Sequence, residues 1–257
     1  MGKKEGGMYK LGLIGTPLSH SFSKKYFDIK FKDEKIKNFT YNLYQLEDLK
    51  NIDSLISREN IIGLNVTQPY KQKIIKYLDN CDQLAIKTKS VNTIFINPKT
   101  NEKIGFNTDV FGFKILLSYF NLKLPNKGLI LGSGGVSKTI SYVLKKNKIE
   151  HKIVSRKPKK NMLNYMELKQ VISDFKLIIN TTPLGEYPKT DLFPNIPYHL
   201  ISAQHQCIDL IYNPKKTIFL KKVHDQGAQI INGKKMLTSQ AIKAWEIWQK
   251  MIKKYDV

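Results

Sequence analysis

A hydroxyl and an ammonium group follow a run of apolar residues in the segment Asn65-Val-Thr-Gln-Pro-Tyr-Lys71. Residues 61–67 are predicted as a buried strand, and open α/β sheets bind ligands at the carboxyl ends of their strands. Lys71 comes about one helical turn after Thr67, so both side chains are expected to face one cleft. A lysine there can move a proton, although in a chain so rich in lysine it can equally be a solvated side chain.

A carboxylate occupies a comparable place in the segment Gly105-Phe-Asn-Thr-Asp109, at the mouth of another predicted strand and just before a helix. Asp109 can simply cap that helix, which is a common use of aspartate. Alternatively it meets Lys71 across a cleft. A neighbouring carboxylate holds a lysine in its charged form while burial opposes that charge, so the two would form an acid/base unit.

A glycine-rich turn separates a predicted strand from a predicted helix within Lys127–Lys138. Three apolar residues end at Gly132, and Gly134 and Gly135 follow before the helical pattern begins at Val136. Glycines let backbone N–H groups approach an anion closely, and the helix N-terminus adds partial positive charge. The pattern therefore suggests a phosphate site. The spacing is shorter than the full dinucleotide motif, so a glycine turn without a ligand stays possible at this point.

A basic turn, Val154–Lys160, comes about 20 residues after these glycines, where dinucleotide folds contact the adenosine ribose. An acidic residue there would favour NAD by binding the 2′-hydroxyl. This chain instead has Arg156 between Ser155 and Lys157, and a guanidinium suits a 2′-phosphate. NADP is therefore favoured over NAD, with a solvated basic turn as the alternative.

The elements that position these residues alternate between strand and helix, which predicts an α/β fold with mainly parallel sheets. A first domain is expected over residues 1–108, with strands at 8–15, 41–46, 61–67, 91–96 and 103–107 and with helices after residue 22, at 46–59 and at 69–78. A second, Rossmann-like doubly wound domain is expected over 109–232, with strands at 128–131, 151–155, 176–181, 206–212 and 229–232 and helices at 110–120, 136–147 and 217–226. An amphipathic last helix carries Trp245 and Trp248 on its apolar stripe, and it is expected to return to the first domain as part of residues 233–257.

The net charge of +22 raises the question of nucleic-acid binding. Only two of the 43 basic residues are arginines, Arg58 and Arg156, and the lysines are scattered along the chain. Base readout and bidentate phosphate contacts favour arginine, so specific nucleic-acid binding is not expected. Weak, nonspecific adhesion to polyanions is expected from the charge alone.

The remaining composition predicts a cytoplasmic protein without a membrane span. No stretch approaches the ~20 apolar residues that cross a bilayer, and Met1–Gly7 lacks the apolar core of a secretory signal. Two cysteines, Cys81 and Cys207, suggest neither a disulfide framework nor a metal site. The histidines are too scattered for metal ligation, so no metal is expected.

These segments together resemble the shikimate dehydrogenase family, and the resemblance covers nearly the whole chain. The segment Gly63–Lys71 is similar to the family's G-x-N-V-T-x-P-x-K motif, which is the most specific of the set. Further matches are His20-Ser-Phe-Ser23, Val91-Asn-Thr93, Asn107-Thr-Asp109, Gly132-Ser-Gly-Gly-Val136, Asn180-Thr-Thr182, Asp209–Pro214 and Gly233–Ala241.

The resemblance implies an NADPH-dependent enzyme that reversibly reduces 3-dehydroshikimate to shikimate in aromatic amino-acid biosynthesis. Lys71 would be the catalytic acid/base, with Asp109 as its partner. The first domain would bind substrate, and the substrate ligands would be Ser21, Ser23, Thr67, Asn92, Asp109, Tyr212 and Gln240. The second would bind NADP through Gly132, Ser133, Gly134, Gly135, Val136, Ser155, Arg156 and Lys157, with Leu210 and Gly233 near the nicotinamide.

Two other functions stay open on the sequence. One is an NAD-using quinate or quinate/shikimate dehydrogenase, which the lack of an acid near residue 155 disfavours. The other is a basic ligand-binding protein on the same scaffold without turnover, which the joint presence of Lys71, Asp109 and the glycine loop disfavours. The expected partner is a small-molecule substrate, and the chain is expected to be a monomer or a homodimer.

Overall fold

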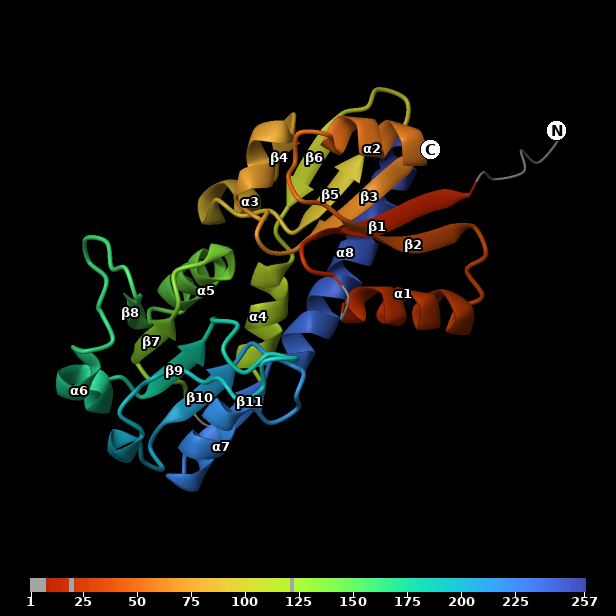
Figure 1. Cartoon of the computed structure of the whole chain (residues 1–257). Coiled ribbons are helices and arrows are strands. Elements are labelled where there is room, and N and C mark those ends of the chain that lie inside the picture. Colours follow the sequence, from red (N-terminus) through yellow and green to blue (C-terminus); the bar gives the residue numbers. More distant parts are fainter. Residues whose placement is uncertain (1–7, 19–20, 121–122) are drawn as a thin grey trace, which may run out of the picture. The chain divides into compact units, whose positions relative to one another are not determined.

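The structure is a computed structural model that describes residues 8–18, 21–120 and 123–257. The chain divides into two compact units (Figure 1). Unit 1 comprises the chain up to Thr108 together with Ala241–Val257, and unit 2 is Asp109–Gln240. The last helix, α8 (Lys234–Tyr255), runs through the second boundary. The sequence prediction draws that boundary earlier, at the start of this helix.

Unit 1 contains a six-stranded sheet in the order β2-β1-β3-β5-β6-β4. Strand β1 pairs in parallel with β2 and β3, but β5 is antiparallel to both β3 and β6. The alternation of elements does not reveal this reversal, because the turn after Ile96 joins β5 directly to β6 as a hairpin. The strands are β1 (Tyr9–Gly15), β2 (Phe39–Gln45), β3 (Ile61–Val66), β4 (Asn80–Cys81), β5 (Thr93–Ile96) and β6 (Lys103–Phe106).

The helix predicted over residues 69–78 is wrong. A turn occupies residues 68–72, and a 3₁₀ helix follows at Lys73–Tyr77. The carbonyls of Gln68 and Lys71 accept hydrogen bonds from Thr16 N (3.2 Å) and Val91 N (2.8 Å), so they serve distant segments rather than an α-helical ladder. The other helices are α1 (Phe22–Asp33), α2 (Ile52–Glu59), which starts later than predicted, and α3 (Gln83–Thr88), which was not predicted.

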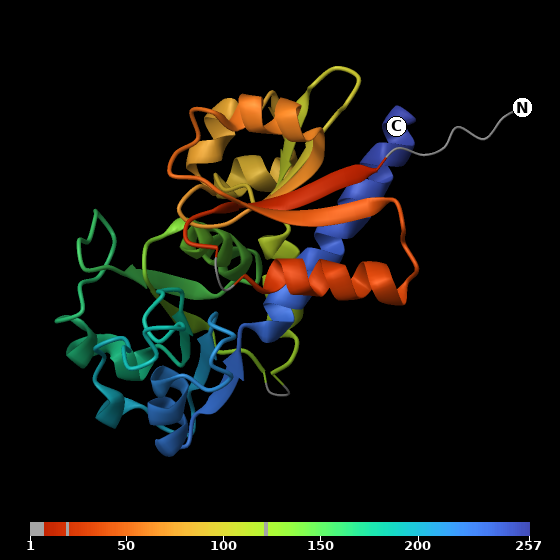
Figure 2. The same ribbon diagram turned by 45° about the vertical axis from the view of Figure 1, so that its right-hand side comes forward.

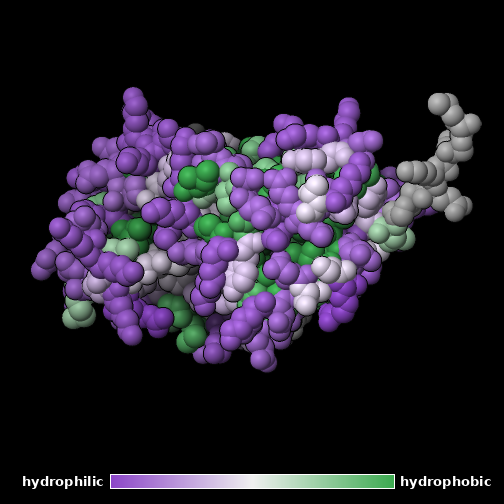
Figure 3. Space-filling view, turned by 90° about the horizontal axis from the view of Figure 1, so that it is seen from above, coloured by the Kyte–Doolittle hydropathy of each residue, from purple (hydrophilic) through white to green (hydrophobic). Residues whose placement is uncertain are grey.

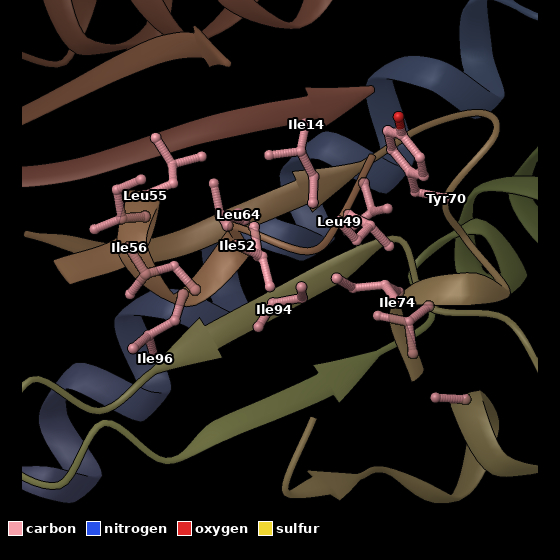
Figure 4. Packing of buried hydrophobic residues seen from close by; sticks show 14 residues of the cluster. Ile14, Leu49, Ile52, Leu55, Ile56, Leu64, Tyr70, Ile74, Ile94 and Ile96 are labelled. Atoms are coloured by element: carbon pink, nitrogen blue, oxygen red, sulfur yellow. The ribbon is translucent and has the colours of Figure 1, made fainter. Parts of the chain in front are cut away.

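Helices cover both faces of this sheet. On one face, α2 packs its apolar side chains onto residues that point the same way from β1, β3 and β5 (Figure 4), among them Ile14, Leu64 and Ile94. On the other face, α1 and the later part of α8 lie beside β1 and β2 (Figure 2). Trp248 is fully buried there and donates from Nε1 to Ile94 O at 2.9 Å. The prediction that both tryptophans are core residues is confirmed, since Trp245 is also buried.

Unit 2 contains a five-stranded, fully parallel sheet in the order β11-β10-β9-β7-β8. The chain starts at β7, moves to β8 on one side and then to β9 on the other, so the topological switch point lies at the end of β7. This confirms the predicted doubly wound sheet. The strands are β7 (Lys127–Leu131), β8 (Glu150–Val154), β9 (Leu177–Asn180), β10 (Gln206–Asp209) and β11 (Gln229–Asn232), and the helices are α4 (Asp109–Leu117), α5 (Gly135–Lys146), α6 (Leu168–Val171) and α7 (Ile218–Asp225).

Hydrophilic residues dominate the face of the molecule seen in Figure 3, and hydrophobic residues show in smaller areas between them. Among the described residues, none of the helices combines the length and the apolar character that a bilayer crossing requires. The same part of the chain contains no cluster of three or more His, Cys, Asp or Glu side chains arranged to hold a metal ion.

Candidate functional site

A row of neutral polar side chains crosses the sheet of unit 1 near the carboxyl end of β3. The Tyr41 hydroxyl donates to Asn65 Oδ1 at 2.8 Å, and Asn65 Nδ2 donates to Asn92 O and Thr93 Oγ1 at 3.2 and 3.1 Å. All of these residues are buried. Burial raises the pKa of the Tyr41 phenol far above its usual range, so the row carries no charge. Neither Tyr41 nor Asn65 was predicted, although an asparagine inside an apolar strand is a visible signal.

The row continues to the residue that precedes Asp109. Asn92 Nδ2 donates to Thr108 Oγ1 at 2.9 Å, and Asn92 Oδ1 accepts from Thr108 N at 2.7 Å. Asn92, predicted to bind substrate, therefore has its amide engaged in holding the end of unit 1. Asp109 then opens α4 and is buried, with its carboxylate in the first turn rather than at the capping position.

Thr67 and Lys71 lie at the exposed end of this row, and both are half-buried. Thr67 N donates to Ile14 O at 3.0 Å, and the Thr67 methyl packs so closely on Gly15 that a Cβ there would lie 2.3 Å away. Because Val91 N donates to the Lys71 carbonyl, Lys71 is tied to the residue next to Asn92. Unit 1 thus brings Thr67, Lys71 and Asn92 together. The pairing of Lys71 with Asp109 stays a prediction.

The predicted substrate loop begins outside the described residues, because Ser19 and His20 are not among them. Ser21 caps α1, and its hydroxyl accepts from Ser23 N at 3.3 Å. Ser23 is buried, and its side chain hydrogen-bonds the Tyr41 hydroxyl. Both serines therefore have structural partners, and Ser23 joins α1 to the polar row. Substrate contacts by these two hydroxyls stay predictions.

The strand register of unit 2 aligns several predicted cofactor residues along one sheet edge. Leu131 pairs with Val154 on one side and Asn180 on the other, and Asp209 pairs with Asn180 and Asn232. Each of these is the last residue of its strand. The residues that follow therefore lie in one row at the carboxyl edge, and they are Ser155, Gly132, Thr181, Leu210 and Gly233. The cofactor residues predicted at the ends of four separate strands thus share one edge.

The glycine loop forms an open cradle at this edge. Gly132 has a positive φ of 108°, and a Cβ there would lie 2.8 Å from Thr181 Oγ1. Gly134 caps α5 without a side chain, and a Cβ there would meet nothing within 4 Å. Ser133 and Gly134 are exposed, while Gly135 and Val136 are half-buried in the first turn of α5. An anion has room to approach the α5 amides here, and α5 has no acidic residue in its first turn to repel it.

The basic turn is attached to the glycine loop through a pair of hydroxyls. Ser155 Oγ lies 3.0 Å from Ser133 Oγ, and it also accepts from Lys157 N at 3.3 Å. Ser155 is buried, whereas Arg156 and Lys157 are exposed beside it. The turn therefore presents two cations next to the cradle, as a 2′-phosphate requires.

A buried carboxylate lies one residue behind this edge. Asp209 Oδ1 accepts from Asn180 Nδ2 at 3.0 Å and from Ile211 N at 3.1 Å, and Oδ2 accepts from Thr217 Oγ1 at 2.6 Å. Burial raises the pKa of Asp209 to about 6, although these three hydrogen bonds oppose the rise. The sequence prediction recognised Asn180 and Asp209 as motif residues without a role, and Thr217 was expected only at the start of a helix.

Gly233 and Gln240 are fixed by close packing within unit 2. A Cβ on Gly233 would lie 1.9 Å from Leu210 O, so only glycine fits beside the loop after β10. Gly112 lies about one turn of α4 after Asp109. A Cβ on Gly112 would lie 3.2 Å from Gln240 Cβ, so Gln240 of α8 packs against α4 at that turn. Gln240 is buried and donates from Nε2 to Leu237 O at 3.0 Å. Tyr212, half-buried, follows the same loop as Leu210.

Comparisons with known proteins agree on one family. The family model described as the shikimate dehydrogenase substrate binding domain matches residues 13–94, which lie in unit 1. A Methanococcus maripaludis protein named shikimate dehydrogenase (NADP(+)) is 41% identical over 255 residues, covering 93% of this chain and 91% of that protein.

Solved structures give the same result. The crystal structure of shikimate dehydrogenase 1 from Peptoclostridium difficile has a TM-score of 0.84 and 36% identity, covering 95% of this chain and 92% of that one. A shikimate dehydrogenase solved in complex with NADP+ has a TM-score of 0.78 and 29% identity, covering 96% and 93% of the two chains.

Proposed function

We propose that this chain, which belongs to the shikimate dehydrogenase family, is an NADP-dependent oxidoreductase that reversibly reduces 3-dehydroshikimate to shikimate. The observation that carries the proposal is one sheet edge of unit 2, where Gly132, Ser155, Leu210 and Gly233 directly follow four parallel strands that end in register. The matching of unit 1 to the family's substrate-binding domain supports the choice of substrate.

The residues of unit 2 fit NADP. The space beside Gly134 is open, as a diphosphate close to the α5 amides requires. Arg156 and Lys157 are exposed next to the hydroxyl pair that ties them to the glycine loop, where they can bind a 2′-phosphate. Gly132, Ser133, Gly134, Gly135 and Val136 would hold the phosphates, and Leu210 and Gly233 would lie beside the nicotinamide. When bound, NADPH supplies the hydride.

The proton transfer is assigned to Lys71. Its ammonium group donates a proton to the oxygen of the C3 ketone as that oxygen gains negative charge, and the amine takes the proton back in the reverse direction. Asp109 is proposed to favour the charged form of Lys71 and to orient it. The backbone of the lysine is held in place because the carbonyls of Gln68 and Lys71 accept hydrogen bonds from Thr16 N and Val91 N.

The substrate's polar groups are proposed to contact hydroxyl, amide and carboxylate side chains. In unit 1 these are Ser21, Ser23, Thr67 and Asn92, of which Ser23 and Asn92 belong to the polar row. In unit 2 they are Asp109, Tyr212 and Gln240. Apart from Asp109, these are neutral hydroxyl and amide groups, so the charge used in proton transfer would come from Lys71 and Asp109.

The proposal is tested by following NADPH absorbance after 3-dehydroshikimate is added to purified protein. Consumption that is much faster with NADPH than with NADH supports it. The oxidation of shikimate and quinate with NADP+ and NAD+ is measured in parallel. Faster turnover of quinate with NAD+ would favour the quinate dehydrogenase alternative, and a folded protein that consumes no NADPH would favour the binding-protein alternative.

We further infer that the protein works in the cytoplasm. Cys81 and Cys207 are both free thiols, and Cys207 is fully buried, which suits a reducing compartment. The proposed partner is the small-molecule substrate, and the proposed assembly is a monomer or a homodimer.

A further inference from the structure

We propose that Asp209 is a positioning residue for NADP: together with Asn180 and Thr217, its ionised carboxylate locks the two loops that carry the predicted phosphate and nicotinamide contacts. This inference rests on the proposed function, because it assumes that the carboxyl edge of the unit 2 sheet binds NADP. The three side chains come from the ends of β9 and β10 and from the N-cap of α7, and all three are buried.

One branch of this cluster leads to the glycine loop. Asn180 donates to Asp209, and its Oδ1 accepts from Thr182 N at 3.0 Å and Thr182 Oγ1 at 2.7 Å. The neighbouring Thr181 donates from Oγ1 to Leu131 O at 2.8 Å, directly before Gly132. Because a Cβ on Gly132 would already touch Thr181 and Thr182, the position of Asn180 sets the position of the glycine loop.

The other branch leads to the predicted nicotinamide contacts. Asp209 accepts from Ile211 N, and Leu210 N donates to Asn180 O at 3.0 Å, so both residues that follow β10 are held by the cluster. Gly233 N donates to Ile211 O at 3.1 Å, and Leu210 O fills the space where a Gly233 side chain would lie. A displacement of the Asp209 side chain would therefore also displace Leu210 and Gly233.

Ionisation matters because a carboxylate only accepts hydrogen bonds, and all three of its partners here are donors. A protonated carboxyl must donate one bond. Thr217 would then have to turn its hydroxyl hydrogen away from Asp209, while its oxygen still accepts from Leu220 N at 3.3 Å as the cap of α7. Protonation therefore reverses one of the three hydrogen bonds that fix the loops and takes the carboxylate acceptor away from the Thr217 hydrogen.

The surroundings of Asp209 bring the protonation of its carboxylate close to neutral pH. Burial is the largest cause of its raised pKa, about 6, and the Glu186 carboxylate adds to it. Glu186 itself has its pKa raised by burial, and the pKa of the Tyr198 phenol is raised by burial first and by Asp209 second. A carboxylate kept in a site that disfavours its charge is better explained by loop positioning than by stability.

The test is the dissociation constant of NADP+ for the whole protein, measured by calorimetry from about pH 5 to about pH 7.5. Asp209→Asn mimics the protonated carboxyl, so its dissociation constant should exceed that of the unaltered protein about tenfold at pH 7.5 and about twofold at pH 5. The ratio of the two constants cancels the titration of the ligand's own 2′-phosphate. Asp174→Asn, at an exposed position of the same unit, should give a ratio of about one throughout.

A second pair of variants separates positioning from folding. Thr217→Val removes a hydrogen bond that lowers the pKa of Asp209, so the loss of NADP+ affinity should begin at a higher pH. Thr217→Ser keeps the hydroxyl and should retain the original profile. Thermal unfolding of each variant confirms that it is folded.

The outcomes distinguish the two inferences. An unaltered protein that binds no NADP+ would overturn the proposed function itself. Tight NADP+ binding by the unaltered protein and by Asp209→Asn, with the same pH profile, would overturn only the positioning role of Asp209.

Discussion

The two units each place a buried polar cluster behind a strand-end site, but they treat charge in opposite ways. In unit 1 the cluster of Tyr41, Asn65 and Asn92 is neutral, and the charge of Lys71 lies outside it at a half-buried position. In unit 2 the charge of Asp209 lies inside the cluster, and the exposed glycine cradle carries none. The proposed proton-transfer group and the proposed loop-positioning group thus have different surroundings.

The difference has a physical reason. Amides and hydroxyls that pair with one another hold a backbone in place at little cost across the whole range of ordinary pH. A buried carboxylate orders three donors at once but costs stability when it is ionised. The cluster of unit 1 is therefore expected to behave alike at all moderate pH values, and the cluster of unit 2 is expected to depend on pH.

The largest expected effect concerns the half-buried charge of Lys71 in unit 1. Lys71→Ala should lower kcat about 10²–10⁴-fold with a much smaller change in substrate affinity, because general acid–base catalysis is typically of this size. Steady-state kinetics with 3-dehydroshikimate measure it. Lys73→Ala, at the exposed start of the following 3₁₀ helix, is the matched control and should leave kcat near its original value. A Lys71→Ala enzyme with unchanged kcat would contradict the assignment of Lys71 as the acid/base.

The next effect tests the neutral cluster. Asn65→Ala removes the acceptor of Tyr41 and the donor to Asn92 O, so the free energy of unfolding should fall by about 3 kcal/mol. Denaturant unfolding at about pH 5 and about pH 8 should give the same loss, since no member of the cluster titrates there. Asn42→Ala, on β2 of the same sheet, is the control. A loss that changes with pH would break the contrast between the units.

The third effect tests the charged cluster through stability alone. The pKa of Asp209 in the folded protein, about 6, lies above the ordinary aspartate value, so ionisation destabilises the fold as pH rises from about 4 to about 6. Asp209→Asn carries no such cost. Its free energy of unfolding relative to the unaltered protein should therefore rise by on the order of 2 kcal/mol between pH 4 and pH 7. A difference that does not vary with pH contradicts the raised pKa.

The smallest effect concerns the cations beside the glycine cradle. Arg156→Ala should raise the KM for NADPH about tenfold and leave the KM for NADH nearly unchanged, because only NADPH offers a 2′-phosphate to the guanidinium. Lys159→Ala, farther along the same exposed turn, is the control. An equal rise for both cofactors would show that Arg156 does not contact the 2′-phosphate.

The sequence predicts the ends of β3 and β7 to within one residue, because an apolar run stops at each, but the strand predicted over 206–212 already ends at Asp209. Leu129–Leu131 ends at Gly132, and the run before Thr67 ends within one residue of β3. The same local signal fails over residues 69–78, since the turn there is held by Thr16 and Val91 from distant parts of the chain. Local propensity contains no information about hydrogen-bond partners that are distant in the sequence.

The clusters behind the sites were hidden for a similar reason. Tyr41 and Asn65 lie on strands that are separated in the sheet by β1, so their contact depends on the strand order. Thr217 reads locally as an ordinary helix cap, and it does cap α7. Its bond to Asp209 becomes visible only once β10 and α7 are packed together.

Hydride transfer itself is the central claim, and isotope transfer tests it most directly. The protein is incubated with 3-dehydroshikimate and NADPH that carries deuterium at the transferring position of the nicotinamide ring. The product is then examined by mass spectrometry and NMR. The account predicts shikimate with one deuterium at C3. Unlabelled shikimate, or no product from folded protein, would contradict it.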